Sequence, residues 1–147
     1  MSSRPSTFTM RFLAQPGTVN FGGKVHGGTV MSWIDQAAYA CATAWAQRYC
    51  VTAYVGGIQF LHPIRIGDVV EVEARVASTG RSSMNLAIEV RSGDLKGDAL
   101  TVTTDCIVVM VAVDADGKSQ PVTPYLPSDD EAKALADSVR AQLAHRR

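Results

Sequence analysis

The sequence predicts an α+β domain in which an antiparallel sheet wraps around one long central helix, with an extra helix at the C-terminal end. Two patterns lead to this prediction. From about Gly27 to Gln47, apolar residues recur at helical spacing, and Asp35 is the only charged side chain between Lys24 and Arg48. Four strand-like runs joined by short turns follow, as in an antiparallel sheet. Because the helix is apolar on nearly all sides, the sheet must curl around it.

The length and composition indicate one globular domain. The chain has 147 residues, of which 46% are hydrophobic and 19% are charged, so it has enough apolar material for one core. No repeat, low-complexity stretch or linker divides it. We therefore expect a single domain over 1–147, with its core at about 6–122 and a C-terminal helix at about 128–146.

The charge and hydropathy of the sequence argue against several classes of partner. The formal net charge is zero at pH 7, so no global positive excess favours nucleic acid. The longest apolar run, 106–113, is far shorter than the roughly 20 residues of a membrane span, and the N-terminal stretch is unlike a signal peptide. We expect a cytoplasmic protein that binds neither nucleic acid nor a membrane.

Residue patterns support each expected strand. The stretch 14–23 is rich in turn formers and reads as the loop that leads into the helix. In the run 68–79, the even-numbered positions from 70 to 76 are apolar and the positions between them are charged, as in a strand with one buried face. The five expected strands are 6–13, 51–61, 68–79, 82–91 and 99–113.

The C-terminal segment has the features of a peripheral helix. Ser128 and Glu131 have the spacing of a capping box, which marks a helix start. A narrow apolar stripe follows at every fourth position, so we expect the helix to dock by one edge; binding of a separate partner is the alternative. The stripe consists of Leu135, Val139 and Leu143.

The cysteines and histidines give no sign of a metal site or a cofactor. The three cysteines have no CxxC spacing and an odd number, so we expect reduced thiols in the core; they are Cys41, Cys50 and Cys106. The three histidines are scattered and lack the spacing of zinc ligands; they are His26, His62 and His145. We therefore expect no metal site.

The predicted architecture requires a second copy of the chain. One sheet cannot enclose a helix completely, so an apolar helix face would remain exposed to water. A second copy would cover that face, which predicts a homodimer at least.

The start of the central helix is a candidate site for a developing negative charge. The sequence "HGG" at 26–28 brings Gly27 and Gly28, which have no side chains, to the unpaired N–H groups of a helix start. Such a start can serve as an oxyanion hole in acyl transfer. The alternative is that the two glycines only let the chain turn into the helix.

Asp35 is the second candidate, because a carboxylate in an apolar helix needs a partner or a function. It follows Gly27 by eight residues, which corresponds to about 12 Å along the helix axis. One substrate cannot contact both groups on one helix, but an antiparallel helix of a dimer mate could bring its own Asp35 beside these glycines. The alternative is a structural aspartate, paired with an arginine or capping a backbone group.

Asn20, in the preceding loop, is the third candidate. Its amide can bind a water or a carbonyl oxygen, although a turn role is the commoner one for a lone asparagine. His26 is a further titratable group beside it, and it can orient the loop rather than act as a base.

These residues, together with three later motifs, resemble the hotdog-fold acyl-CoA thioesterases. The later motifs are "F-x-x-P-x-x-x-GD" from Phe60, "GRSS" at 80–83 and "VAVD-x-x-GK" from Val111. The resemblance covers about Thr18 to Val122 and is strongest to the YciA-type acyl-CoA hydrolases. The His26 that precedes the glycines is more like the phenylacetyl-CoA thioesterases, which leaves the acyl group open between aliphatic and aryl.

The resemblance implies a hotdog fold and hydrolysis of an acyl-CoA thioester to a free carboxylic acid and CoA. Asp35 would act as general base on water or as nucleophile, the Gly27 N–H would polarise the carbonyl, and Asn20 would be the loop asparagine of the family. It also implies a site shared between subunits and a hexamer built as a trimer of dimers. CoA enters as part of the substrate and not as a cofactor.

The anionic CoA needs local positive charge. The turn at 80–83 is the candidate for this, with Arg81 contacting a phosphate and its neighbours Gly80, Ser82 and Ser83 completing the contact; a plain hairpin is the alternative. Weaker candidates are Lys24, His62 and Arg65. His26 and Gly28 at the helix start are further substrate-binding candidates. The acyl pocket would be lined by Phe60 with Val30 and Met31, although each of these three is more often plain core.

Two other functions fit the same fold. A non-catalytic acyl-CoA sensor would bind the ligand without turnover, although the sequence shows no DNA-binding segment. A dehydratase or hydratase would need a histidine paired with an acid, and only His26 could serve, at an unsuitable spacing from Asp35.

Overall fold

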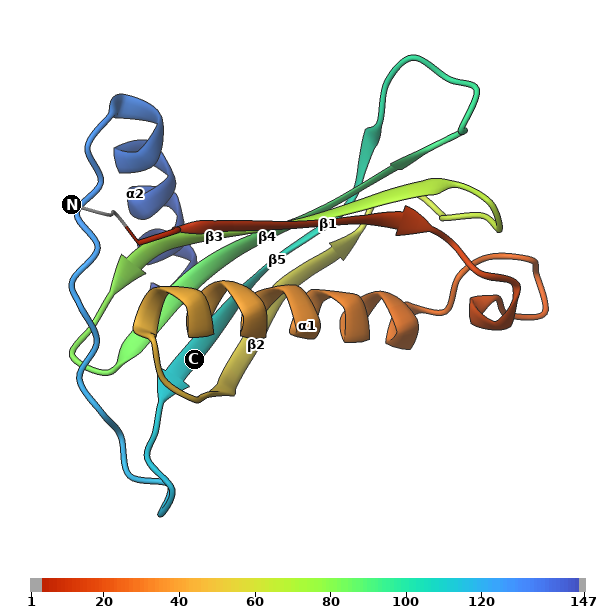
Figure 1. Ribbon diagram of the computed structural model, residues 1–147. Coiled ribbons are helices and arrows are strands. Elements are labelled where there is room, and N and C mark those ends of the chain that lie inside the picture. The colour runs from red at the N-terminus through yellow and green to blue at the C-terminus, as the bar shows by residue number, and fades with distance from the viewer. Residues whose placement is uncertain (1–3, 146–147) are drawn as a thin grey trace.

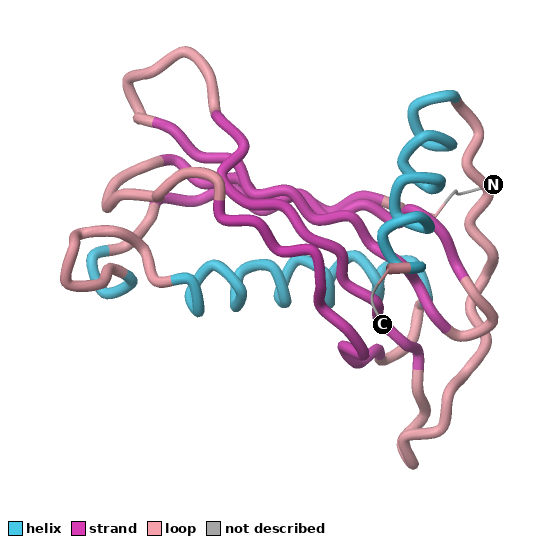
Figure 2. The backbone as a smooth tube through the Cα atoms, turned by 180° about the vertical axis from the view of Figure 1, so that it is seen from behind, coloured by secondary structure: helices cyan, strands magenta, loops and turns pink. Residues whose placement is uncertain are grey.

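The computed structural model describes residues 4–145 and confirms an α+β architecture built on one antiparallel sheet. The five strands lie in the order β1-β3-β4-β5-β2, with the long helix α1 on one face and the shorter helix α2 on the other (Figures 1 and 2). The elements are β1 Thr7–Leu13, a short 3-10 turn Pro16–Thr18, α1 Gly27–Ala46, β2 Cys50–Phe60, β3 Val69–Thr79, β4 Ser83–Gly93, β5 Thr101–Ala112 and α2 Asp130–Ala144.

The alternating pattern of β3 sets which face of the sheet covers α1. Its even-numbered side chains from 70 to 76 are all buried under the helix, as predicted from the sequence. The strand β4 alternates in the same way but continues to Gly93, beyond the predicted end at residue 91. It does so because Ser92, which is buried, pairs with Val70 on one side and Thr101 on the other.

One face of α1 is buried and the other is exposed. The sheet covers eight of its residues: Val30, Ile34, Ala37, Ala38, Cys41, Ala42, Trp45 and Ala46. The opposite face exposes Met31, Asp35 and Tyr39, so one side of the helix stays uncovered in a single chain, as expected for one sheet around one helix. The physical reason is that five strands curl around only one side of a helix. The helix ends at Ala46, and its C-cap Gln47 adopts a left-handed conformation with φ 56°.

The helix α2 docks on the outer face of the sheet through the predicted stripe. Val139 is buried against Ala77 and Ile107, with Leu135 and Leu143 packed around them. The predicted capping box is wrong, because the N-cap residue is not the serine at 128. Asp129 caps the helix instead, and its carboxylate accepts a 2.7 Å hydrogen bond from the backbone N–H of Ala132.

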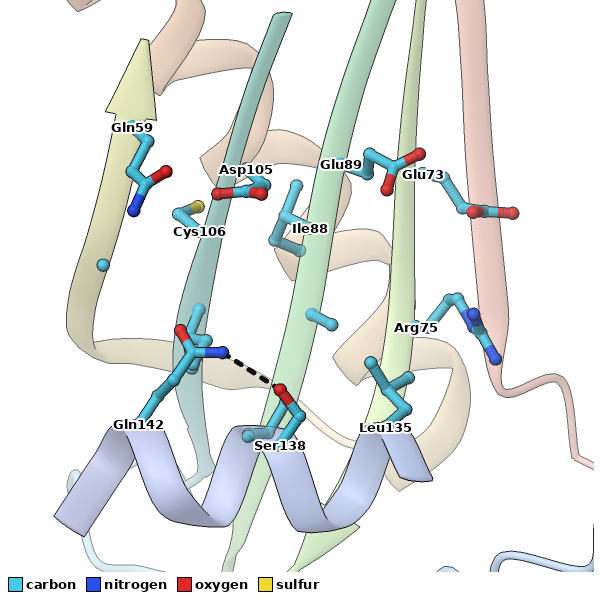
Figure 3. A pocket seen from close by; sticks show the side chains of 14 residues that line it. Gln59, Glu73, Arg75, Ile88, Glu89, Asp105, Cys106, Leu135, Ser138 and Gln142 are labelled. Atoms are coloured by element: carbon cyan, nitrogen blue, oxygen red, sulfur yellow. Dashed lines mark hydrogen bonds between the residues drawn. The ribbon is translucent and has the colours of Figure 1, made fainter. Parts of the chain in front are cut away.

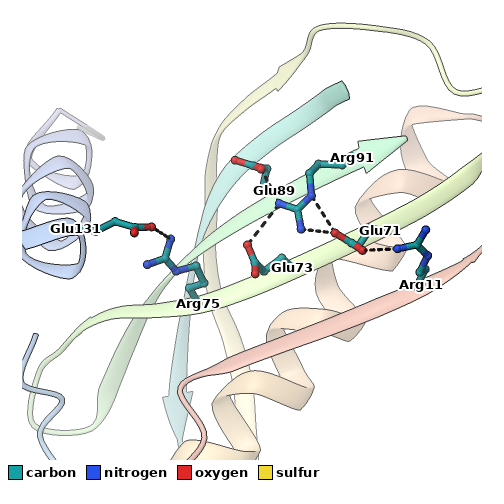
Figure 4. A network of polar contacts seen from close by, with 7 residues as sticks. All are labelled: Arg11, Glu71, Glu73, Arg75, Glu89, Arg91 and Glu131. Atoms are coloured by element: carbon teal, nitrogen blue, oxygen red, sulfur yellow. Dashed lines mark hydrogen bonds and ion pairs between the residues drawn. The ribbon is translucent and has the colours of Figure 1, made fainter. Parts of the chain in front are cut away.

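Glu131 pairs across to the sheet rather than with its own helix start. Its carboxylate lies 3.3 Å from an Arg75 guanidinium nitrogen on β3 (Figure 4). On the same face, Arg91 contacts carboxylates on both sides and Arg11 extends the chain of charges through Glu71. The Arg91 contacts are Glu71 and Glu89, both at 2.6 Å, and Glu73 at 3.4 Å. In this network the charged side chains at alternate positions of β3 and β4 neutralise one another on the outer face of the sheet.

The three cysteines are reduced and buried, as predicted. Burial raises the pKa of Cys41 and of Cys106 to about 12, and it also raises the pKa of Cys50. They therefore behave as small apolar core residues rather than as nucleophiles. Among residues 4–145, neither helix combines the length and the apolar character that crossing a bilayer would need.

Candidate active site

The loop before α1 is held in place by backbone hydrogen bonds just ahead of the helix start. The His26 N–H donates to the Thr18 carbonyl at 2.9 Å, and the Val25 N–H donates to the Ile64 carbonyl at 2.9 Å. The first of these closes the loop on itself and the second ties it to the segment between β2 and β3. The helix start is thus held at a fixed place at one end of the sheet.

The N–H groups at this helix start are open to a ligand. The first bond within the helix runs from the Val30 N–H to the His26 carbonyl at 3.1 Å, which leaves the N–H groups of Gly27 and Gly28 without a partner among the described residues. Both glycines are exposed, and no acidic side chain lies in the first turn. His26 is the N-cap, but its ring makes no capping bond. The geometry can therefore stabilise negative charge on an oxygen.

Asn20 stabilises a turn, which was the alternative interpretation of this residue. Its side-chain carbonyl accepts hydrogen bonds from the Gly22 N–H at 2.9 Å and the Lys24 N–H at 3.2 Å. These two bonds fix which way the amide points. Because the oxygen is occupied, the NH₂ end faces outward, and it has no partner among the described residues. A turn role and a ligand-binding role are therefore compatible at this position.

A cavity of about 330 Å³ lies beside the helix start. Gly27 and Phe60 are neighbours in its wall, since a Cβ at position 27 would lie 3.5 Å from the tip of the Phe60 ring. Val30 also lines it, whereas Met31 does not and lies on the exposed face of α1. The full lining is Lys24, Val25, Gly27, Val30, Phe60, Leu61, His62, Pro63, Ile64 and Thr104.

Asp35 lies on the exposed face of α1, and not in the buried setting that the sequence suggested. The reason is the uncovered side of the helix described above. Among the described residues it pairs with no arginine, so the structural alternative of an arginine pair is excluded there. Its Oδ1 instead accepts a 2.7 Å hydrogen bond from the hydroxyl of Thr52 on β2.

Thr52 is a site residue that the sequence did not point to. It sits 17 residues beyond Asp35, in a run that reads only as a strand. Its position beside the helix depends on how β2 packs against α1, which is a tertiary contact with no local signature. A carboxylate held by a hydroxyl has a fixed orientation even at an exposed position.

The turn at 80–83 lies at the other end of the molecule. It joins β3 to β4 at the end of the sheet where α1 terminates (Figure 1). The 20 residues of α1 separate it from the helix start by roughly 30 Å. Arg81 is exposed and donates a 3.0 Å hydrogen bond to the Ser119 hydroxyl, and the Gly80 N–H donates to the Ser83 carbonyl at 2.9 Å. Within one chain, this turn and Gly27 cannot contact one small ligand group.

Around Asp35 lies a band of exposed apolar side chains. Met31 and Tyr39 on α1 are each more than 40% exposed, and Tyr49 and Val51 extend the band onto the start of β2. The Tyr39 and Tyr49 rings meet edge to face, with centroids 6.2 Å apart. The strand β2 is also an edge strand of the sheet. A surface of this kind is suited to a second copy of the chain.

A larger cavity, of about 510 Å³, lies on the opposite face of the sheet, under α2 (Figure 3). Carboxylates from three adjacent strands stand in one row across it, because Glu73 is the register partner of Glu89 and Glu89 is the partner of Asp105. None of the predicted site residues lines this cavity. The chemistry predicted from the sequence therefore belongs to the α1 side.

Comparison with known proteins assigns the chain to a family. Residues 22–99 match the model of the thioesterase superfamily. Protein VdlD of Helicobacter pylori (strain ATCC 700392 / 26695) is 35% identical over 121 residues, which cover 82% of this chain and 69% of that protein. The acyl-CoA thioester hydrolase YciA of Salmonella typhimurium is 34% identical over 116 residues, which cover 77% and 87%.

Solved structures of acyl-CoA thioesterases are similar to this chain over nearly its whole length. An apo-hexameric acyl-CoA thioesterase has a TM-score of 0.88 at 33% identity, covering 96% of this chain and 94% of its own. The acyl-CoA hydrolase of Staphylococcus aureus in complex with butyryl-CoA, CoA and CoA disulfide has a TM-score of 0.88 at 28% identity, covering 95% and 85%. Structures of three alanine variants of that enzyme are also similar to this chain, and the variants replace an asparagine, an aspartate and a threonine. Along that enzyme's chain, these three positions have the same spacing as Asn20, Asp35 and Thr52 have here.

Proposed function

The chain belongs to the thioesterase superfamily, and we propose that it hydrolyses the thioester of an acyl-CoA to a free carboxylic acid and CoA. The observation that carries the assignment is the similarity to acyl-CoA hydrolases in both sequence and structure. The site geometry supports it, since an open helix start and an oriented carboxylate are the two groups that thioester hydrolysis needs.

The helix start stabilises the oxygen of the thioester carbonyl. As a nucleophile attacks the carbonyl carbon, the C=O electrons move onto oxygen, and the Gly27 N–H donates to that developing charge. Gly28 leaves room for close approach of the ligand, and the capping residue His26 borders the same opening. The outward NH₂ of Asn20 is a second donor, for either the carbonyl or the attacking water.

Asp35 supplies the attack. As a general base it takes a proton from water, whose oxygen bonds to the carbonyl carbon; as a nucleophile it bonds to that carbon first and water then cleaves the anhydride. In both routes the C–S bond breaks and the CoA thiolate takes up a proton. The Thr52 hydrogen bond holds the carboxylate in one orientation, and the matching spacing of the three residues in the S. aureus variants supports this set.

The complete site is shared between two copies of the chain. On one helix, Asp35 lies about 12 Å along the axis from Gly27, too far to act on the same carbonyl. An antiparallel α1 from a second copy would bring its Asp35 beside the first helix start and would cover the exposed apolar band around it. Hexameric structures among the similar thioesterases support an assembly of such dimers, as a trimer of dimers.

The same pairing gives the turn at 80–83 a role. In one chain Arg81 is about a helix length from the catalytic glycine, but an antiparallel partner reverses the ends. Arg81 would then contact a CoA phosphate of the neighbouring site, with Ser82 and Ser83 as hydroxyl donors and Gly80 shaping the turn. Phe60 lines the cavity that would receive the acyl group.

The experiment that tests this function is thiol release from a panel of aliphatic and aryl acyl-CoA esters. Wild type is compared with Asp35→Ala and with Asp35→Asn, which keeps the shape of the side chain. We expect turnover by wild type and a loss of about 100-fold or more in both variants. Binding of acyl-CoA by wild type without release of thiol from any ester would contradict hydrolysis and indicate a sensor.

A further inference from the structure

We propose that Thr104 determines acyl-group specificity and that the preferred acyl chains carry a hydroxyl or oxo oxygen; this inference rests on the proposed function. Thr104 lies on β5 directly opposite Phe60 of β2 in the strand register. Both residues line the cavity beside the helix start, together with Gly27 and Val30. The threonine is thus part of the surface that an acyl chain meets once its carbonyl is bound at Gly27.

The cavity wall is mostly apolar, and its polar side chains differ in depth. Lys24 is half-buried and His62 is exposed, so both can keep their polar ends in water. Thr104 is only 1% exposed. It is therefore the polar side chain that stands in the buried part of the cavity.

No hydrogen bond of the Thr104 hydroxyl is found among the described residues. Its oxygen is not one of their fully buried polar side-chain atoms without a partner, a class that holds only the Thr43 hydroxyl, so the Thr104 oxygen is still open to the cavity. The neighbouring Thr103 is also buried, yet its hydroxyl donates to the Val90 carbonyl at 3.0 Å, as buried hydroxyls usually do. The contrast is informative because a hydroxyl in a largely buried cavity wall is unfavourable without a partner, which a molecule in the cavity can supply. A hydroxyl that faces a cavity and stays unpaired within the protein can bond to a ligand.

The chemistry of threonine sets the class of ligand. A hydroxyl can donate to an oxo oxygen and can accept from a hydroxyl, so it matches either group on an acyl chain. A saturated chain would leave it unpaired. Pockets that hydrogen-bond a substrate oxygen discriminate against the analogue that lacks it, whereas a purely apolar pocket discriminates weakly. The cavity, of about 330 Å³, has room for a short chain of this kind.

The test compares four CoA esters of equal chain length: butyryl, 2-hydroxybutyryl, 3-hydroxybutyryl and 4-hydroxybutyryl. Thiol release gives kcat/KM for each ester with wild type, Thr104→Val and Thr104→Ser. For each protein, the measured quantity is the kcat/KM of each hydroxylated ester divided by the kcat/KM of butyryl-CoA. Valine keeps the shape of threonine without its hydroxyl, whereas serine keeps the hydroxyl. We therefore expect the highest of the three wild-type ratios to fall about 3- to 10-fold in Thr104→Val and to be retained in Thr104→Ser.

Thr103→Val is the matched control, because it removes a neighbouring buried hydroxyl that does not line the cavity. Its ratios should equal those of wild type. Turnover with ratios unchanged in Thr104→Val for all three hydroxylated esters would overturn the inference while leaving the hydrolase function intact. If wild type released thiol from none of the esters, the proposed function would be wrong and this inference with it.

Discussion

The hydroxyl of Thr52 on β2 donates a 2.7 Å hydrogen bond to Oδ1 of Asp35, in the middle of α1. The two residues are distant in sequence and join the helix to the edge strand. Both are exposed in one chain, and this is the only bond among residues 4–145 that holds the carboxylate in one orientation before a substrate binds. The relationship makes Thr52 a positioning residue for the proposed catalytic acid.

Replacing Thr52 tests that positioning. We expect Thr52→Val to lower kcat about 3- to 10-fold, the value of one lost hydrogen bond, while Thr52→Ser keeps most of the activity. Steady-state thiol release with both variants measures this difference, and circular dichroism checks that each is folded. Equal activity of the valine and serine variants would contradict the positioning role.

Gly27 allows its N–H group to be removed without disturbing the helix. Proline is tolerated at the first helical position, and the preceding His26 already has φ −60° and ψ 140°, which suit a residue before proline. We expect Gly27→Pro to lower kcat by about 100- to 1,000-fold, because the carbonyl loses its donor.

Gly27→Ala is the control for this change, because it keeps the N–H group. Its added Cβ would lie 3.5 Å from Phe60, which is ordinary contact. It should therefore retain most of the wild-type kcat. If the alanine variant loses as much activity as the proline variant, then activity depends on the absence of a side chain at position 27 and not on the N–H group there.

Arg81 should affect CoA binding more than chemistry. We expect Arg81→Ala to raise KM several-fold with a smaller effect on kcat, because a phosphate contact is made equally in the ground state and the transition state. The effect should shrink as salt is added, since an exposed arginine is screened. Kinetics at two salt concentrations check this, with Arg81→Lys as the variant that keeps the charge. An unchanged KM would leave the turn as a plain hairpin.

Glu71 should make the stability of the fold depend on pH. The hydrogen bond from Arg91, with a further contribution from Arg11, lowers the pKa of this carboxyl in the folded chain. Its stabilising effect is therefore complete above the unfolded-state pKa of about 4.3 and is lost as pH falls through the lower folded-state value. The measurement is urea denaturation of wild type and Glu71→Gln from pH 7 down to pH 3.

We expect the difference in unfolding free energy between these two proteins to be constant near neutral pH and to shrink at acid pH. Glu131→Gln is the control, since Glu131 is largely exposed in its pair with Arg75 and such pairs contribute little. A difference that does not vary with pH would argue that Glu71 acts through packing and not through its charge.

The sequence predicted the fold well because local patterns determine it. The single charge in the apolar helix marked Asp35, and the alternation in β3 marked the buried face. At the start of α2, two adjacent residues could both cap, and the sequence pattern favoured Ser128 where the structure uses Asp129. Local patterns do not distinguish such neighbours.

The parts of the site that the sequence missed depend on contacts between distant segments. Thr52 meets Asp35 only because β2 packs beside α1, and Thr104 meets Phe60 only through the register of β2 with β5. The burial expected for Asp35 was wrong for one chain because the sheet covers only the opposite side of the helix and leaves the face of Asp35 exposed. In the sequence, a contact between subunits appears only as apolar residues on a helix face, and no motif identifies the partner.

The most direct test of the central claim, a site shared between two chains, is to mix two inactive variants. Asp35→Ala and Gly27→Pro subunits are co-expressed with different tags, and the hybrid content is measured by native mass spectrometry. Random pairing should restore about a quarter of wild-type activity, because each hybrid dimer contains one site with both intact groups. Hybrids that form but release no more thiol than the separate variants would contradict the shared site.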